Sequence, residues 1–123
     1  MKFTGICLIT NNVPALTKFY ANVLGVEALG DGNHAELNTE GANISIFSAQ
    51  GMEDMVSDSM HGAGHGSFTI GFEVRDINAE YRRLRAMDIE FLMFPTAHPW
   101  GCSSFWFRDP DGNIVDFYAM QAN

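Results

Sequence analysis

FWFRDPDGNIVDFY, residues 105–118, decides the fold of this chain. Two runs of apolar and aromatic residues flank the turn Asp109-Pro-Asp-Gly-Asn113. Pro110 holds its φ at roughly −65°, and Gly112 and Asn113 tolerate the positive φ that a tight turn requires. Because the chain must reverse direction between the two runs, the stretch predicts a β-hairpin.

The same order of elements is predicted twice along the chain. The first half predicts a strand at 3–10, a helix that begins at Asn12 and ends at Gly25, and short strands near 26–30, 34–39 and 42–48. The second half predicts a strand at 67–74, a helix capped by Asp76, and strands near 89–94, 102–107 and 113–119. Asparagine and aspartate are preferred N-caps, so both helix starts have a local cause. Each half is therefore predicted to be a β-α-β-β-β module.

A chain of 123 residues suits one domain. We expect residues 1–123 to form it, with module one at 1–48, module two at 67–123, and a linker at 49–66. The linker is rich in Gly, Met and acidic residues and is predicted to be exposed and mobile. Four apolar residues in it have helical spacing, so a short helix stays open: Met52, Met55, Val56 and Met60.

The charge argues against polyanionic partners. Fifteen acidic residues against seven basic ones give a net charge of −8, the opposite of what nucleic acids or anionic membranes attract. No apolar run approaches the roughly 20 residues of a membrane span, and Met1-Lys-Phe-Thr-Gly5 has no export signal. We therefore expect a cytoplasmic protein. In that compartment Cys7 and Cys102 should be thiols, most often small buried hydrophobes.

Two motifs together carry a resemblance to a known family. The helix end Phe19-Tyr-Ala-Asn-Val-Leu-Gly25 and the turn at 109–113 resemble those of the vicinal oxygen chelate superfamily, which holds glyoxalases, bleomycin-resistance proteins and extradiol dioxygenases. The resemblance covers nearly the whole chain. It implies an α+β fold with two βαβββ modules, whose curled mixed sheets surround a cavity, and it implies a homodimer.

The resemblance also bears on metal binding. The family's four ligand positions match Gly5, Ser45, Thr69 and Asp116 in this sequence. Of these only Asp116 could be a strong ligand, because glycine has no side chain and neutral hydroxyls are poor donors to catalytic divalent ions. The resemblance therefore implies neither a metal nor another cofactor. It disfavours glyoxalase and dioxygenase chemistry, which needs the metal.

Strand alternation predicts which side chains face the cavity. Apolar Phe68, Ile70, Phe72 and Val74 should face the helix-covered core, so Thr69, Gly71 and Glu73 should face the other side. The same alternation, with His98 and Trp100 added from a loop, gives the predicted ligand-binding residues: Phe3, His34, Glu36, Ser45, Phe47, Thr69, Glu73, His98, Trp100, Asp116 and Tyr118. Alternatives remain for the loop, since His98 could stack on proline at the surface and Trp100 could anchor a dimer interface.

Two classes of function follow from these observations. The first is a metal-free small-molecule binding protein of the glyoxalase/bleomycin-resistance type, which would sequester a cationic or aromatic compound as antibiotic-resistance proteins do. The second is an enzyme of the same superfamily, of lyase, isomerase or dioxygenase type. It would use a shifted metal site or acid-base residues drawn from Glu36, Glu73, His34 and Asp116. The sequence does not identify the ligand.

Overall fold

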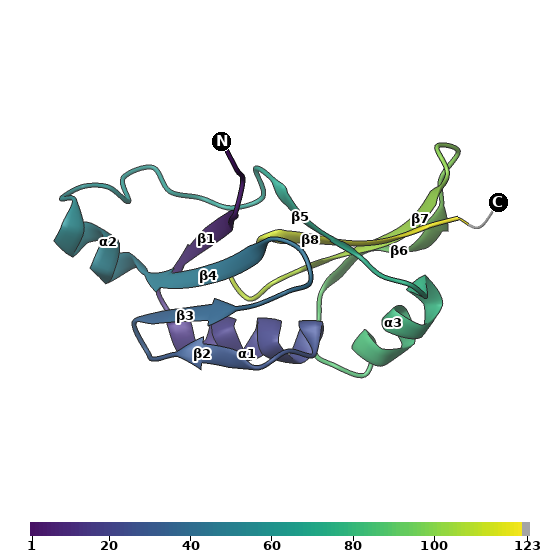
Figure 1. Cartoon of the computed structure of the whole chain (residues 1–123), viewed down its shortest axis with the longest axis horizontal. Helices are drawn as coiled ribbons and strands as arrows, with labels where there is room; N and C mark the ends of the chain where they lie inside the picture. Colours follow the sequence, from purple (N-terminus) through teal and green to yellow (C-terminus); the bar gives the residue numbers. More distant parts are fainter. Residues whose placement is uncertain (122–123) are drawn as a thin grey trace. The chain divides into compact units, whose positions relative to one another are not determined.

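The computed structural model describes residues 1–121 and divides into two compact units, Met1–Ala63 and Gly64–Asn123 (Figure 1). Each unit contains one four-stranded mixed sheet with a helix against one face. The predicted α+β fold with two βαβββ modules is confirmed. None of the helices within residues 1–121 is long and apolar enough to cross a membrane.

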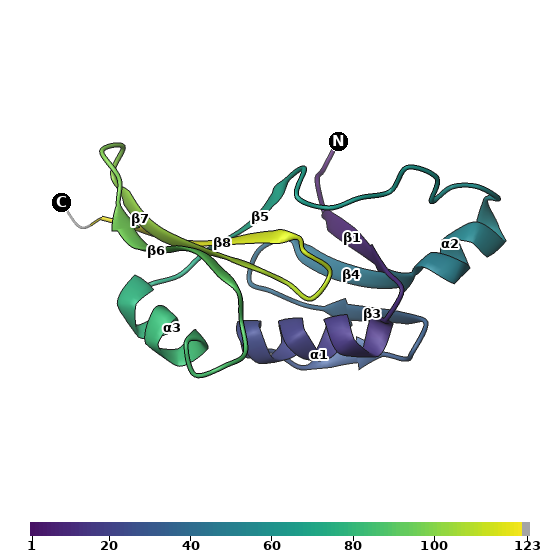
Figure 2. The same cartoon turned by 180° about the vertical axis from the view of Figure 1, so that it is seen from behind.

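The first unit is built from four strands and two helices. In chain order they are β1 (Gly5–Thr10), α1 (Val13–Leu24), β2 (Ala28–Gly30), β3 (His34–Leu37), β4 (Asn43–Ser48) and α2 (Ala49–Met55). The sheet order is β1-β4-β3-β2, with β1 and β4 parallel. Helix α1 lies along one side of this sheet (Figure 2), and its apolar stripe is buried: Val13, Leu16, Tyr20 and Val23.

Local signals explain where α1 begins and ends. The Asn12 side chain accepts a hydrogen bond from the backbone N–H of Ala15, as its N-cap role predicts. Gly25 ends the helix with a left-handed φ of 67°, a conformation that glycine adopts without steric cost.

The second unit repeats the arrangement. Its elements are β5 (Thr69–Glu73), α3 (Ile77–Leu84), β6 (Phe91–Ala97), β7 (Cys102–Arg108) and β8 (Ile114–Met120), in the sheet order β5-β8-β7-β6. The core is an aromatic cluster between α3 and the sheet: Tyr81, Phe91, Phe105, Phe107 and Phe117. The other face of the sheet is free of α3, and it holds the residues of interest below.

The turn at 109–113 is organised by a buried carboxylate. Asp109, only 4% exposed, accepts hydrogen bonds at Oδ1 from the backbone N–H groups of Asp111 and Asn113, both at 2.9 Å. Its Oδ2 accepts one from Asn113 Nδ2 at 2.8 Å. Gly112 has a φ of 88° and its carbonyl accepts from Arg108 Nη1. These contacts join β7 to β8, so the predicted hairpin is confirmed.

Several predicted boundaries and burials are wrong. Phe68, expected in the core, precedes β5 and is 47% exposed. β6 runs from Phe91 to Ala97 rather than 89–94, and its pairing with β7 is irregular around Pro95, which has no N–H to donate. Cys7 and Cys102 are free thiols, but Cys7 is exposed and Cys102 half-buried. Cys7 alternates with buried Leu8, which places it on the opposite side of β1.

The segment expected to be a linker contains α2. Ser48 caps this helix by accepting a hydrogen bond from the backbone N–H of Gly51 at 2.9 Å. Glu53 lies inside this helix. Its carboxylate accepts hydrogen bonds from two backbone N–H groups in the segment that follows the helix, those of Asp58 and Met60. A short helix therefore forms, but over Ala49–Met55, so it contains Met52 and Met55 of the predicted pattern and not Val56 and Met60.

Candidate functional site

The candidate site lies on the face of the second sheet that is turned away from α3. The core residues Ile70, Phe105, Phe107, Val115 and Phe117 alternate with side chains on this face. We call it the open face, formed by Thr69, Gly71, Glu73, Ser104, Trp106, Ile114, Asp116 and Tyr118. Strand register arranges its centre in two rows: Gly71, Asp116 and Trp106 lie side by side, and so do Glu73, Tyr118 and Ser104.

The Asp116 carboxyl on the open face has a shifted pKa. Desolvation by burial raises the pKa of its carboxyl above the usual 3.8, while a hydrogen bond from the Trp106 side chain and attraction to His98 act in the opposite direction. Its Oδ1 is buried and has no hydrogen-bond partner among residues 1–121. The carboxylate is therefore only partly compensated by the protein, which makes it a candidate for binding a cation or a proton.

His98 is held in place by two contacts. Its Nε2 is hydrogen-bonded to Ser104 Oγ at 2.6 Å, and Ser104 is only 4% exposed. The imidazole stacks on the Trp100 indole with ring centroids 4.5 Å apart and planes 3° apart. The ring that covers His98 is thus Trp100 rather than the proline considered above. Trp100 itself is 73% exposed, so it is available for contact with a ligand or a partner.

Four predicted residues of the first half lie on the first sheet, on the face turned away from α1: His34, Glu36, Ser45 and Phe47. Register places Cys7, Ser45 and Glu36 in one row, and Phe47 beside His34 with ring centroids 6.1 Å apart. Helix α2 packs onto Phe47: a Cβ at buried Gly51 would lie 2.4 Å from Phe47 Cζ. Phe3 lies before β1 and is exposed.

The predicted ligand-binding residues therefore fall into two sets. Thr69, Glu73, Asp116 and Tyr118 share the open face, with His98 and Trp100 attached to it through Ser104. The others, Phe3, His34, Glu36, Ser45 and Phe47, belong to the first unit. Our sequence reasoning missed Ser104 and Trp106. The signal was present in Cys102–Arg108, where buried Phe105 and Phe107 place their neighbours on the opposite face.

The residues that the resemblance matches to the metal positions do not fit a metal ion. Gly5, Ser45 and Thr69 offer no imidazole, thiolate or carboxylate, and Asp116 alone does not make a site. Across residues 1–121, no group of three or more His, Cys, Asp or Glu side chains could hold a metal ion.

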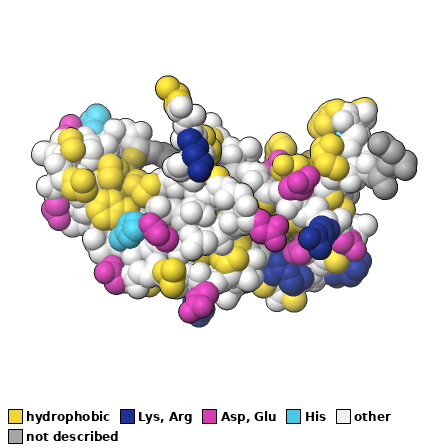
Figure 3. All heavy atoms as spheres, viewed as in Figure 1, with side chains coloured by type: hydrophobic (Ala, Val, Ile, Leu, Met, Phe, Trp, Pro, Cys, Tyr) yellow, Lys and Arg dark blue, Asp and Glu magenta, His cyan; other side chains and the backbone are white. Residues whose placement is uncertain are grey.

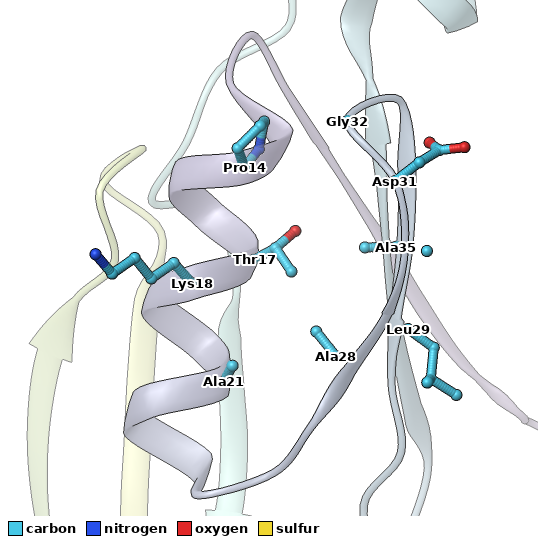
Figure 4. A pocket seen from close by; sticks show the side chains of 10 residues that line it. Pro14, Thr17, Lys18, Ala21, Ala28, Leu29, Asp31, Gly32 and Ala35 are labelled. Atoms are coloured by element: carbon cyan, nitrogen blue, oxygen red, sulfur yellow. The ribbon is translucent and has the colours of Figure 1, made fainter.

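A separate cavity lies in the first unit, on the α1 side of its sheet. It measures about 270 Å³, and Figure 4 shows Thr17 and Ala21 of α1 facing Ala28 and Ala35 of β2 and β3 across it. The Thr17 hydroxyl oxygen is buried, and none of the predicted ligand-binding residues lines this space. Lys18 and Asp31 also line it, but Figure 4 shows their charged ends pointing away from the space, so its polar groups do not converge on a ligand.

The surface charge agrees with the sequence. Figure 3 shows Asp and Glu side chains scattered across the visible face rather than gathered into one block. The net charge of −8 gives the protein a negative field overall, which favours cationic over anionic ligands.

Comparisons with known proteins agree with this fold. Residues 2–117 match the model of the Glyoxalase/Bleomycin resistance protein/Dioxygenase superfamily. The chain is 26% identical over 127 residues to the uncharacterized protein YraH of Bacillus subtilis (strain 168), covering 98% of this chain and 99% of that protein.

Solved structures show the same architecture. A glyoxalase/bleomycin resistance protein/dioxygenase from Nocardioides is 24% identical, with a TM-score of 0.80 over 100% of this chain and 85% of that one. A family enzyme from Burkholderia phytofirmans PsJN is 15% identical, with a TM-score of 0.84 over 95% of this chain and 97% of that one. The alternating strands, the paired modules and the family match lead to one conclusion: this chain belongs to the glyoxalase/bleomycin resistance protein/dioxygenase superfamily.

Proposed function

We propose that the protein binds a small cationic aromatic molecule on the open face without the help of a metal ion. The observation that carries this proposal is Asp116, a partly desolvated carboxyl whose Oδ1 has no hydrogen-bond partner among the described residues. A ligand cation bound beside this carboxyl would offset its charge, and Glu73, the register partner of Tyr118 on β5, would add a second negative charge.

Aromatic side chains on the open face support the proposal that the ligand is aromatic as well as cationic. Trp106 is the register partner of Asp116, and Tyr118 lies two residues further along β8 on the same face. Trp100, which stacks on His98, adds a third aromatic ring. Aromatic rings bind both planar ligands and cations, the latter through attraction to the negative ring face. The combination suits a ligand that is flat and positively charged.

Titration with a matched pair of dyes tests this proposal. We expect 9-aminoacridine, a planar cation, to quench tryptophan emission saturably at pH 7.5, and neutral acridine to bind more weakly. Trp100→Ala should weaken the cation's affinity by about 1–3 kcal/mol, the usual value for a stacking aromatic. Phe94→Ala is the control, because Phe94 is exposed but packs against Tyr81 on the α3 side. Equal binding by wild type and Trp100→Ala would place the ligand elsewhere.

A second candidate function rests on the same carboxyl. A raised pKa lets Asp116 act as a general base or acid, and His98 lies near enough to influence it. An enzyme of this type would be the superfamily alternative to a binding protein. The two candidates differ in whether a bound cationic aromatic compound is recovered unchanged, which mass spectrometry of the incubated mixture decides.

We predict that protein purified without chelators carries less than one transition metal ion per ten chains, because three of the four family positions lack a strong donor. Elemental analysis by inductively coupled plasma mass spectrometry measures this. One Ni, Zn, Mn or Fe per chain that disappears in Asp116→Ala would instead reveal a shifted metal site and favour the enzyme.

We also propose a homodimer. Large apolar side chains stay exposed on the second unit, among them Phe94, Trp100 and Met120, and each sheet ends in edge strands. Sedimentation velocity over a 100-fold concentration range should give the mass of two chains. A monomer at every concentration would contradict this proposal.

A further inference from the structure

We infer that Gly71 selects an ammonium group: its missing side chain leaves an opening beside Asp116 in which a primary or methylated amine of the ligand binds. This inference rests on the proposed function, and it adds the chemical class of the cation and the residue that admits it. Gly71 is the register partner of Asp116 in the parallel pair β5 and β8.

The fold itself does not require glycine at this position. A Cβ built on Gly71 would meet only ordinary van der Waals contact, with Tyr118 Cε1 at 3.7 Å, and Gly71 has no positive φ. Gly5 in the corresponding strand of the first unit is different, because a Cβ there would lie 2.0 Å from the Asn43 carbonyl oxygen. Gly5 is thus explained by sterics, and Gly71 is not.

Glycine inside a strand is unfavourable, because it lacks a side chain to pack and loses more backbone freedom on folding. A residue that weakens β5 without a steric reason indicates a place where something approaches the backbone closely. The residues around Gly71 indicate which chemical group approaches the backbone there. Asp116 lies opposite, the Tyr118 ring lies alongside, and Glu73 follows two residues later on the same face.

The state of the Asp116 carboxyl favours ammonium over guanidinium. Trp106 already donates one hydrogen bond to the carboxyl, and Oδ1 is buried, so a ligand cannot reach both carboxylate oxygens at once. A guanidinium prefers two parallel hydrogen bonds to both carboxylate oxygens, whereas an ammonium is a compact charge that needs one. The face of the adjoining Tyr118 ring can also attract the ammonium group, or the N-methyl groups of a methylated amine, by a cation–π interaction.

Calorimetric titration with three probes tests the inference: 1-naphthylmethylammonium, neutral 1-naphthalenemethanol and 1-naphthylmethylguanidinium. We expect wild-type protein to bind the ammonium at least 10-fold more tightly than either of the others. Gly71→Val should lower the affinity for the ammonium to that for the alcohol, while the affinity for the alcohol changes less than 3-fold. Gly71→Ala should reduce the preference in part, because its side chain fills less of the opening.

Gly64→Val is the matched control, because it makes the same change at a loop glycine whose Cβ meets nothing within 4 Å in the described part of the chain. Its probe affinities should equal those of the wild type. The thermal midpoint of Gly71→Val should be at or above the wild-type value, since valine favours strands, and this separates lost binding from lost folding.

The remaining outcomes would overturn the inference in distinguishable ways. If Gly71→Val keeps the ammonium preference, or if the guanidinium binds best, Gly71 does not select an ammonium, although the proposed binding function stands. An equal loss of affinity for all three probes would make Gly71 a general contact rather than a selector. If wild-type protein binds none of the probes, the proposed function itself fails.

Discussion

Replacing Asp116 with asparagine is expected to weaken binding of 9-aminoacridine by roughly 10- to 100-fold and, at pH 7, to raise the melting temperature. The loss of affinity follows from removing a charged hydrogen-bond acceptor, a contact worth about 1.5–3 kcal/mol. The gain in stability follows from burial, because desolvation disfavours the ionised carboxyl in the folded protein. A group that lowers stability and supports binding is typical of a functional site.

The raised pKa of Asp116 also predicts how the difference in melting temperature between Asp116→Asn and the wild type changes with pH. Because the folded-state pKa of Asp116 is raised, its contribution to stability is fully present below the unfolded value of 3.8 and is lost as the pH rises through the folded pKa. Asparagine stays neutral throughout. The melting temperature of Asp116→Asn minus that of the wild type should therefore be largest near pH 7, on the order of a few degrees, and shrink toward pH 4.

The matched control is Asp88→Asn, which neutralises an exposed carboxylate in the loop between α3 and β6. It should leave both the melting temperature and the dye affinity close to wild type. A lower melting temperature in Asp116→Asn at pH 7 would mean that the bond from Trp106 outweighs desolvation. Asp116 would then be a structural residue rather than a binding one.

Asp109→Ala is expected to lower the free energy of unfolding by about 2–4 kcal/mol. It removes the acceptor of three hydrogen bonds, from the backbone of Asp111 and Asn113 and from the Asn113 side chain. Asp109 and Asn113 are buried, so the abandoned donors cannot all turn to water, and each costs roughly 1–3 kcal/mol. The three losses overlap because one turn makes all of them.

Urea unfolding followed by tryptophan emission measures this change, since Trp100 and Trp106 both lie in the second unit. Asp111→Ala is the control in the same turn, because Asp111 Oδ2 is buried but accepts no hydrogen bond from any residue in 1–121. Its cost should stay below about 1 kcal/mol. Similar losses in the two variants would show that the turn depends on its overall charge rather than on the Asp109 hydrogen bonds.

Local patterns were sufficient to predict much of this protein. Asn12, Asp76, Gly25 and the turn at 109–113 act on neighbours a few residues away, so their effects can be read without knowing the fold. The predicted alternation is seen in 114–120, where Val115, Phe117 and Ala119 are buried, but in 69–73 only Ile70 is buried and Phe72 is half-buried. The boundaries of β6 could not be predicted, because its register shifts depend on how Pro95 meets the neighbouring strand.

The sequence by itself determined the order of elements, the hairpin and the side of each strand on which a residue lies, because these follow from spacing along the backbone. Only the tertiary structure decided what those side chains meet. It brought Ser104 to His98 and Trp106 to Asp116, set Gly71 opposite Asp116 on the neighbouring strand, and placed Gly51 on Phe47. Such contacts join separate strands and helices, so they depend on register and packing, which no local pattern encodes.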